Sequence, residues 1–444
     1  MTHDLDPLFA PSSIAVYGAS ATNPGKLGNT LLGNIKEGVQ EVLCIHPSAR
    51  DIAGVSARPR LDRGVDLALV SVPAHAVEKA VQDAADGGAR VIVVLSSGFG
   101  EAGADGQASQ DRITAVVREH GIRLIGPNCM GVVSHLGDDR WLNGSYFWSV
   151  PKLPGSLSFV SQSGAFGGMF LSEVRRRELG FARFISLGNS PDVDVTHALS
   201  WLAGDPETAV IGVFVEGLRD GRAFVETARA ITPHKPIVVL KGGLSDAGAR
   251  AAAGHTGSLA GRARAYEAGF RRAGVRTVRD SAEFFDVLTA FAAPPLRQHG
   301  NRIAVLTISG GPGVLAADAA ERAGLHLPTL SDVRQAAIRV YVPDFAATAN
   351  PIDLTPQCPP ASFAAAIAEV YADDDLDGVV VINCGLDIPE FGAGVAKAHT
   401  ATGKPTTAFL LDVPRVQLAV SAAGIPCFGS PEAAVRGFAA GVTQ

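Results

Sequence analysis

The chain has 444 residues, enough for two or three domains, and its 47% hydrophobic and 18% charged residues are typical of a folded globular protein rather than a disordered one. A net charge of −6 provides no general attraction to nucleic acid or to an anionic membrane surface. The first residues do not form a signal sequence and no apolar run is long enough to span a bilayer, so we expect a cytoplasmic protein.

Short runs of β-branched apolar residues alternate with longer helical patterns along the whole chain. Examples are Ser13–Tyr17, 66–72 and Val91–Leu95. Continuous apolar runs, rather than alternating ones, are typical of strands that are buried on both faces of a parallel sheet covered by helices. The sequence therefore predicts an α/β fold built of doubly wound layers.

This pattern lapses at 135–154 and at 293–300, where turn residues gather. The two breaks predict three domains, at 1–136, 150–293 and 299–444. The second and third domains resemble diverged copies of one flavodoxin-like plan, because 157–164 and 303–310 both lead from a strand into Ser-Gly. Further corresponding segments are 211–215 with 378–382, and 235–239 with 404–408.

A glycine-rich stretch at 16–33 follows the first strand and opens a helix. Its small residues let backbone amides approach a phosphate group, which the amino terminus of the helix also favours electrostatically. The alternative is a tight turn whose glycines serve packing only. We predict a phosphate-bearing ligand here. The candidate contacts are Gly18, Ala19, Ser20, Lys26 and Gly28.

The tip of the second strand indicates which nucleotide this ligand contains. A site for NAD places an acidic side chain at that tip. Here the strand Glu41–Ile45 runs into His-Pro-Ser-Ala-Arg at 46–50, and Asp51 follows only later. A neutral or cationic tip suits a ribose phosphate, as in CoA or NADP, better than the free diol of NAD. CoA therefore ranks ahead of NAD.

Two later strand ends should face the same crevice, because ligands of open α/β sheets bind beyond the carboxyl ends of the strands. We expect these loops to form walls for the adenine and the pantetheine of the ligand. The candidate wall residues are Ser71, Val72, Pro73, Ser97 and Gly98.

A third strand end, at 124–131, carries Asn128 and Cys129, which we expect near the thioester end of the ligand. A free cysteine is more often a small buried apolar residue than a nucleophile, and we assign no nucleophilic role to Cys129. The five cysteines of the chain are scattered and form no CxxC pair, which predicts reduced thiols and no metal site.

The second domain opens with another turn from a strand into a helix, at 161–168. The hydroxyl and amide groups of Ser163 and Gly164 are suited to hold phosphate or an acyl phosphate against the helix dipole. A nucleophilic serine would need a positioned base and acid, which no nearby motif supplies. We therefore predict binding, not attack, by this turn.

The most informative stretch, at 241–261, places His255 among glycines and alanines. A lone histidine is ordinarily structural or solvated. Here the small neighbours permit a mobile loop that carries the imidazole between sites, while Thr256 and Gly257 offer donors to phosphate oxygens. A nucleophilic imidazole also needs an acceptor at its other nitrogen. Glu216, at the end of the strand 211–215, is the best-placed candidate, although such carboxylates are more often solvated.

Taken together, these motifs resemble the α subunits of ADP-forming (NDP-forming) acetyl-CoA and acyl-CoA synthetases, relatives of the succinyl-CoA synthetase α subunit. The likeness covers nearly the whole chain, and the histidine motif is its most specific part. The matching segments are 18–20, 126–129, 161–164, 186–189 with 192–194, 215–217, 254–261 and 350–355. One departure is at 46–49, where relatives usually carry Asn-Pro-Lys; we expect Arg50 to replace that lysine.

The resemblance implies a CoA-binding Rossmann domain followed by two flavodoxin-like ligase domains, and a phosphohistidine at His255 that Glu216 supports. It further implies a small carboxylic acid and its acyl-CoA as substrates. The sequence shows no ATP-grasp portion, so we expect ADP or ATP with Mg²⁺ to bind a separate ATP-grasp β subunit, in an α2β2 assembly. Neither nucleic acid nor membrane is an expected partner.

Two other interpretations remain open. A non-catalytic or regulatory CoA-binding relative explains the fold but has no need for His255 and Glu216. A nicotinamide dehydrogenase ranks third, because the second strand has no acid at its tip.

Overall fold

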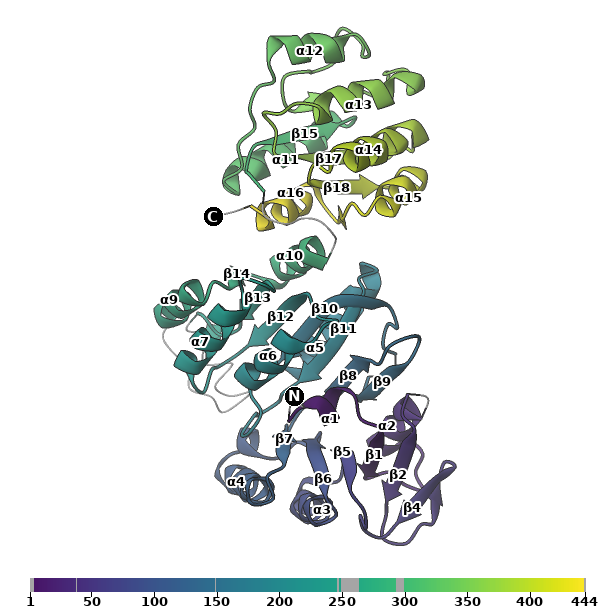
Figure 1. The fold of residues 1–444 in the computed structure, drawn as a ribbon, viewed down its shortest axis with the longest axis vertical. Helices are drawn as coiled ribbons and strands as arrows, with labels where there is room; N and C mark the ends of the chain where they lie inside the picture. The colour runs from purple at the N-terminus through teal and green to yellow at the C-terminus, as the bar shows by residue number, and fades with distance from the viewer. Residues whose placement is uncertain are drawn as a thin grey trace. The chain divides into compact units, whose positions relative to one another are not determined.

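The computed structural model describes residues 4–36, 38–147, 149–245, 247–248, 263–292 and 299–442. Three sheets, most of whose strands are parallel, are distributed over two compact units, Met1–Arg279 and Asp280–Gln444 (Figure 1). Within the part of the chain that the structure describes, no helix is both long and apolar enough to cross a membrane.

The first sheet has the strand order β3-β4-β2-β1-β5-β6-β7. Apart from the antiparallel pair β3 and β4, its neighbours run parallel, and without β3 the order is that of a dinucleotide-binding fold. The strands are β1 (Ser13–Tyr17), β2 (Glu41–Ile45), β3 (Asp51–Ile52), β4 (Val55–Arg58), β5 (Val65–Val70), β6 (Ala89–Val94) and β7 (Arg123–Ile125).

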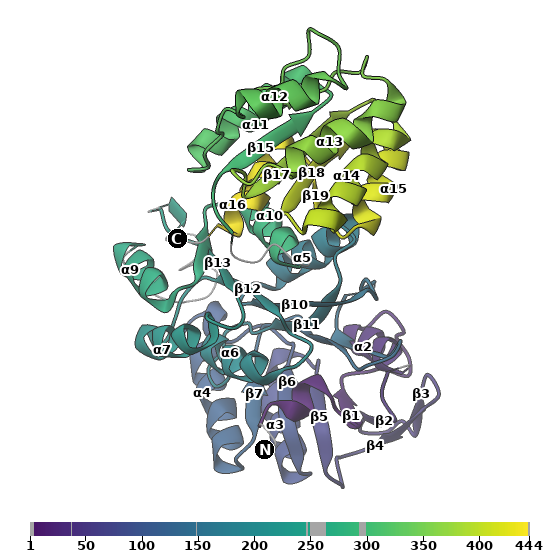
Figure 2. The ribbon, with the colours of Figure 1, turned by 45° about the horizontal axis from the view of Figure 1, so that its top comes forward.

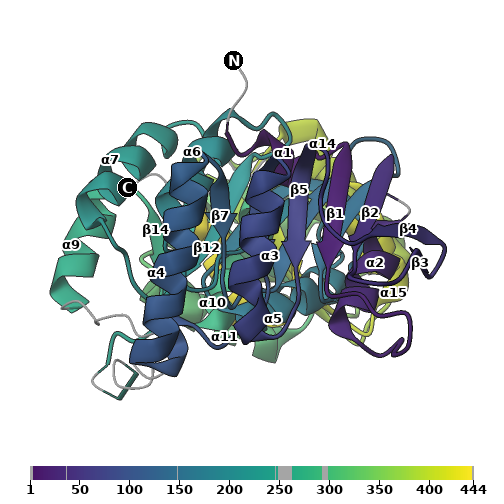
Figure 3. The same cartoon turned by 90° about the horizontal axis from the view of Figure 1, so that it is seen from below.

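Helices cover this sheet, as its continuous apolar strands require. In Figure 3, α3 and α4 lie side by side along it, and both contact its strands. The helices of this part are α1 (Asp6–Phe9), α2 (Leu27–Ile35), α3 (Ala74–Asp86) and α4 (Ala104–Glu119), with a 3-10 turn η1 (Gly100–Ala102). Every residue of β1 after Ser13 is buried, which confirms the prediction of strands covered on both faces.

The second sheet has the order β14-β13-β12-β10-β11-β8-β9. Its five parallel strands follow the flavodoxin order 2-1-3-4-5, counted along the chain from β10, while β8 and β9 add an antiparallel hairpin beside β11. The strands are β8 (Gly131–His135), β9 (Trp141–Ser145), β10 (Pro154–Ser161), β11 (Phe181–Ser186), β12 (Val210–Val215), β13 (Ile237–Lys241) and β14 (Arg276–Val278). The helices are α5 (Gly164–Arg176), α6 (Val195–Gly204), α7 (Gly221–Ile231) and α9 (Ala263–Ala273).

The hairpin of β8 and β9 lies where the sequence pattern lapses. Its side chains pack onto the second sheet: the ring of Trp141 lies 5.0 Å from that of Phe181 and 5.0 Å from that of His135, between centroids. The strand β8 therefore belongs to the second sheet although it falls within the range 1–136 predicted for the first domain.

The third sheet has the order β16-β15-β17-β18-β19, which is again 2-1-3-4-5. Its strands are β15 (Ile303–Thr307), β16 (Ile352–Asp353), β17 (Gly378–Cys384), β18 (Thr406–Leu411) and β19 (Cys427–Phe428). The helices of this unit are α10 (Ser281–Ala292), α11 (Gly310–Arg322), α12 (Asp332–Arg339), α13 (Phe363–Tyr371), α14 (Pro389–Thr402), α15 (Pro414–Ala422) and α16 (Pro431–Ala440), with a 3-10 turn η2 (Pro360–Ser362). Figure 2 shows α13, α14 and α15 side by side, and α16 contacts both α10 and α11.

The shared strand order of the second and third sheets confirms the predicted repeat. In both, the first strand ends in the same small motif: the Ser161 hydroxyl donates to the Ser163 carbonyl (2.7 Å), and the Thr307 hydroxyl donates to the Ser309 carbonyl (2.9 Å). The division into units falls at 279/280 and groups α10 with the third sheet. The three domain ranges themselves stay predictions.

Candidate functional site

A pocket of about 590 Å³ lies where four parallel strands of the first sheet end. The strands β1, β2, β5 and β6 end at residues 17, 45, 70 and 94, and the residues around these ends form its wall. The lining residues are Gly18, Ala19, Lys26, Leu27, Ile45, His46, Pro47, Ser71, Val72, Pro73, Ala74, Leu95, Ser96, Ser97 and Tyr146. A ligand site at this edge of the sheet is what the sequence predicts.

The glycine turn of this pocket depends on two glycines. Gly18 has a φ of +102°, and a Cβ on it would collide with the Ser71 carbonyl oxygen. A Cβ on Gly28 would collide with the backbone of Gly18. The turn is closed by Asn29, whose side chain accepts from the Ser20 amide (2.7 Å) and donates to the Ser20 carbonyl (2.9 Å). The backbone of this turn therefore packs closely around the start of α2, and Lys26 lies at the pocket.

Seven of the twelve residues predicted for the nucleotide site line this pocket. These are Gly18, Ala19, Lys26, Ser71, Val72, Pro73 and Ser97. Ser20 and Gly28 shape the glycine turn. Arg50, expected to replace a lysine, is not among the lining residues; His46 is, and its Nδ1 accepts from the amides of Ser48 (3.3 Å) and Ala49 (3.0 Å).

Asn128 and Cys129 lie behind the pocket wall. The Asn128 amide donates to the carbonyl of Ser96, a lining residue (2.9 Å). The Cys129 thiol is buried 3.4 Å from the Val94 carbonyl oxygen, and burial raises its pKa to about 12. The thiol is therefore protonated at neutral pH; that Cys129 has no nucleophilic role stays a prediction.

Tyr146 is a pocket residue that the sequence did not single out. It follows β9 and so reaches the pocket from the hairpin of the second sheet. Its hydroxyl lies 2.6 Å from the Ser71 hydroxyl, and burial raises its pKa to about 12. Its only sequence signal is an aromatic residue within a turn-rich segment.

Glu101 was also not singled out, and it fixes the loop after β6. Its carboxylate accepts from the amides of Gly98 (2.6 Å) and Phe99 (3.2 Å), and from the side chain of Asn189 (2.6 Å). Asn189 also donates to Gln110 (2.9 Å). Burial alone would raise the pKa of Glu101, but the hydrogen bonds from Asn189 and the two amides outweigh burial and lower it. The pocket loop is thus tied to the loop that follows β11.

The predicted phosphate turn has the expected geometry at the start of α5. Ser163 is the N-cap, and its hydroxyl accepts from the Phe166 amide (3.4 Å). Gly164 is the first helical residue. The amides of the first helical turn have no partner within the helix, so this end is suited to an anion.

Gln162 connects this turn to Glu216. Its side-chain oxygen accepts from the amides of Glu216 (2.6 Å) and Gly217 (3.0 Å), and its nitrogen donates to the Gly217 carbonyl (2.8 Å). Beneath Glu216, which is buried, the ammonium group of Lys241 donates to the Glu216 carbonyl (2.8 Å) and lies 4.6 Å from the ring centroid of Tyr266. Burial lowers the pKa of Lys241, opposed by the charge of Glu216.

The structure thus brings Ser163, Gly164 and Glu216 together. The other predicted residues of this site, His255, Thr256 and Gly257, lie outside the described residues. Their roles stay predictions.

Three family models match successive parts of the chain. Residues 12–135 match the model of a CoA binding domain, 154–291 that of a succinyl-CoA ligase like flavodoxin domain, and 303–386 that of a ligase-CoA domain.

The relatives cover nearly the whole chain. The α subunit of the ADP-forming acetate–CoA ligase II of Pyrococcus furiosus is 33% identical, over 96% of this chain and 95% of that protein. The chain therefore belongs to the family of ADP-forming acyl-CoA ligase α subunits. The ADP-forming acetate–CoA ligase I of Archaeoglobus fulgidus is 34% identical over 97% of this chain and 62% of its own length. The dinucleotide forming acetyl-coenzyme A synthetase 1 of Candidatus Korarchaeum cryptofilum, solved with phosphate and ADP, has a TM-score of 0.86 at 32% identity, covering 98% and 96%.

Membership of this ligase family confirms the predicted resemblance and fold.

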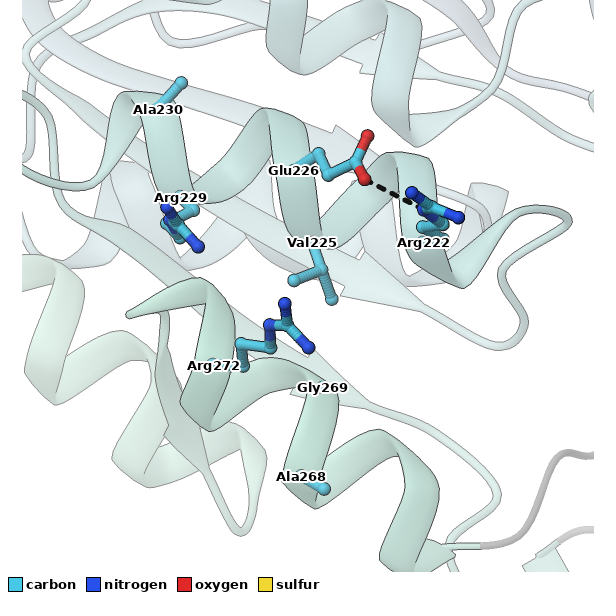
Figure 4. A pocket seen from close by; sticks show the side chains of 8 residues that line it. All are labelled: Arg222, Val225, Glu226, Arg229, Ala230, Ala268, Gly269 and Arg272. Atoms are coloured by element: carbon cyan, nitrogen blue, oxygen red, sulfur yellow. Dashed lines mark hydrogen bonds and ion pairs between the residues drawn. The ribbon is translucent and has the colours of Figure 1, made fainter.

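A larger hollow, of about 1050 Å³, lies between α7 and α9 (Figure 4), where Arg222 pairs with Glu226 (2.9 Å). It contains none of the predicted site residues that the structure describes. Its lining residues are Arg222, Val225, Glu226, Arg229, Ala230, Ala268, Gly269 and Arg272.

Proposed function

We propose that this chain is the α subunit of an ADP-forming acyl-CoA synthetase that works through an acyl phosphate and a phosphohistidine at His255. The observation that carries the proposal is full-length similarity to named α subunits, together with a pocket at the strand ends of the matched CoA binding domain. The pocket, with its glycine turn, helix start and Lys26, suits the phosphates of CoA.

The reaction has three reversible steps. An oxygen of phosphate attacks the thioester carbonyl carbon, the C–S bond breaks, and CoA leaves while acyl phosphate forms. His255 then attacks the phosphorus atom and the free acid leaves. Finally, the phosphoryl group passes from the imidazole to ADP.

Each described residue of the second site has a role in these steps. The amides at the start of α5, with Ser163 and Gly164, hold phosphate and stabilise its negative charge. Glu216 accepts a hydrogen bond from one nitrogen of His255, which leaves the other nitrogen free to attack and stabilises the phosphorylated, cationic ring. Gln162 keeps the glutamate turn beside the phosphate turn.

The last step requires a nucleotide site, which we assign to a separate ATP-grasp β subunit that binds ADP or ATP with Mg²⁺. The name α subunit, carried by the Pyrococcus relative, supports such a partner. We further propose an α2β2 assembly in the cytoplasm.

The test is mass spectrometry of the chain after incubation with labelled ATP, with and without an ATP-grasp subunit. We expect an acid-labile phosphate on His255 only with the subunit. His255→Ala should abolish phosphorylation and acyl-CoA synthesis while CoA still binds, and Glu216→Gln should reduce both by at least about tenfold. The matched control His234→Ala should change neither.

Near-normal synthesis by His255→Ala would contradict the proposed mechanism. Absence of phosphate under both conditions, with CoA still bound, would instead favour a regulatory CoA-binding protein.

A further inference from the structure

Two short segments connect the CoA pocket with the phosphate turn, and the first is 128–130. Its Asn128 amide is bonded to the carbonyl of Ser96, a pocket residue. Two residues later, the Met130 amide donates to the Ser186 hydroxyl (3.0 Å). The Met130 side chain lies against the phosphate turn, since a Cβ on Gly164 would be only 2.5 Å from Met130 Cγ.

The second segment is Tyr146 and Phe147. Tyr146 lines the pocket and contacts Ser71, while the ring of Phe147 lies over the first turn of α5, because a Cβ on Gly168 would be 3.2 Å from Phe147 Cε1. The two segments are joined by a hydrogen bond from the Tyr146 amide to the Met130 carbonyl (3.3 Å).

These connections show how close the pocket and the phosphate turn are along the chain. Consecutive Cα atoms are about 3.8 Å apart, so one or two residues separate the pocket wall from the phosphate turn. In the proposed reaction, on which this inference rests, the thioester carbonyl must meet both the sulfur of CoA and an oxygen of phosphate. The acyl chain then runs beside Met130 and Phe147, whose side chains are both only partly buried.

We propose that Met130 and Phe147 form the wall against which the acyl chain packs and that they set the length of the acid that is accepted. Phe147 is held firmly: its ring lies edge-on to Phe184 at 5.7 Å, and its carbonyl accepts from the side chains of Asn34 (3.2 Å) and Asn143 (3.1 Å). Met130 has an unbranched side chain that adapts to the shape of its neighbours. Neither side chain carries a charge, so the wall suits the alkyl part of a substrate.

The test compares acyl-CoA substrates of increasing length with the complex of the chain and its partner subunit. Phosphate-dependent release of CoA from acetyl-, butyryl- and hexanoyl-CoA is followed as free thiol. Met130→Ala and Phe147→Ala should each raise the hexanoyl-to-acetyl ratio of kcat/KM by about tenfold or more, because an apolar pocket discriminates by this factor for each methylene group. Phe147→Leu should give a smaller increase.

A matched control is Phe345→Ala, the same truncation at a residue that is 69% exposed in the other unit; it should leave the ratio unchanged. If the hexanoyl-to-acetyl ratio of kcat/KM is unchanged in both Met130→Ala and Phe147→Ala while the affinity for CoA is retained, the proposal is wrong. If Phe147→Ala does not fold, Phe147→Leu and Met130→Ala decide the question. If the unsubstituted complex binds CoA but releases none from any acyl-CoA substrate, the proposed function itself is wrong. The proposal about Met130 and Phe147 then fails with it.

Discussion

At the scale of single residues, the hydroxyl of Tyr146 lies 2.6 Å from that of Ser71 in the pocket that we propose binds CoA. Tyr146→Phe keeps the ring and removes this hydrogen bond. We expect the affinity for CoA to fall about threefold to tenfold, since one neutral hydrogen bond has this net value. Isothermal titration calorimetry measures it. The control Tyr266→Phe removes a hydroxyl that contacts Leu218, away from this pocket, and should bind CoA normally; equal affinity of all three proteins would contradict a role for Tyr146.

The site residues that could be predicted from the sequence differ in one respect from those that could not. Gly18 and Ser71 follow their own strands directly, so their place at the sheet edge can be predicted from local pattern. Tyr146 reaches the first sheet from the second, and Glu101 is held by Asn189, which follows β11 of the second sheet. Because such contacts depend on how two sheets pack, no local pattern indicates them.

At the scale of elements, Gln162 joins the start of α5 to the turn after β12 through three hydrogen bonds. Gln162→Met has a similar size but leaves two amides and one carbonyl without their partner. We expect a loss of about 2 kcal/mol in the free energy of unfolding and a thermal midpoint lower by about 4 °C. Differential scanning calorimetry detects this shift. Gln82→Met, which removes a solvent-exposed hydrogen bond from Gln82 to Asp86, is the matched control. An equal shift in both variants would show that the Gln162 side chain does not stabilise this junction.

Strands with continuous apolar runs could be predicted well, and short edge strands could not. The predicted strand Ser13–Tyr17 coincides with β1, and 66–72 overlaps β5 (Val65–Val70). By contrast, β9 (Trp141–Ser145) contains Asn and Gly and lies at the edge of its sheet, so it reads as a turn. Its stability comes from pairing with β8 and from the packing of Trp141, both of which are tertiary.

At the scale of the whole molecule, the internal repeat could be predicted because two copies of one plan preserve the order of their motifs. The grouping of the sheets into compact units could not be predicted in this way. The two sheets before residue 280 form one compact unit, joined at Asn189, Glu101 and Gln110. This joint is made of polar side chains from a loop, the 3-10 turn η1 and the helix α4, which in a sequence look like ordinary solvated residues.

The joint also makes a pH dependence predictable. The folded protein holds the pKa of Glu101 below its ordinary value of about 4.3. The unfolded chain therefore binds this proton more readily, so the stabilisation is complete above the unfolded pKa and is lost as the pH falls through the folded pKa. We expect Glu101→Gln to be less stable than the unsubstituted protein at pH 7, with the gap narrowing below about pH 4. Urea unfolding across this pH range measures the gap. Glu119→Gln, at an exposed residue of α4, should follow the unsubstituted protein throughout; a gap that stays constant or widens in acid would show that the Glu101 carboxylate does not hold the joint.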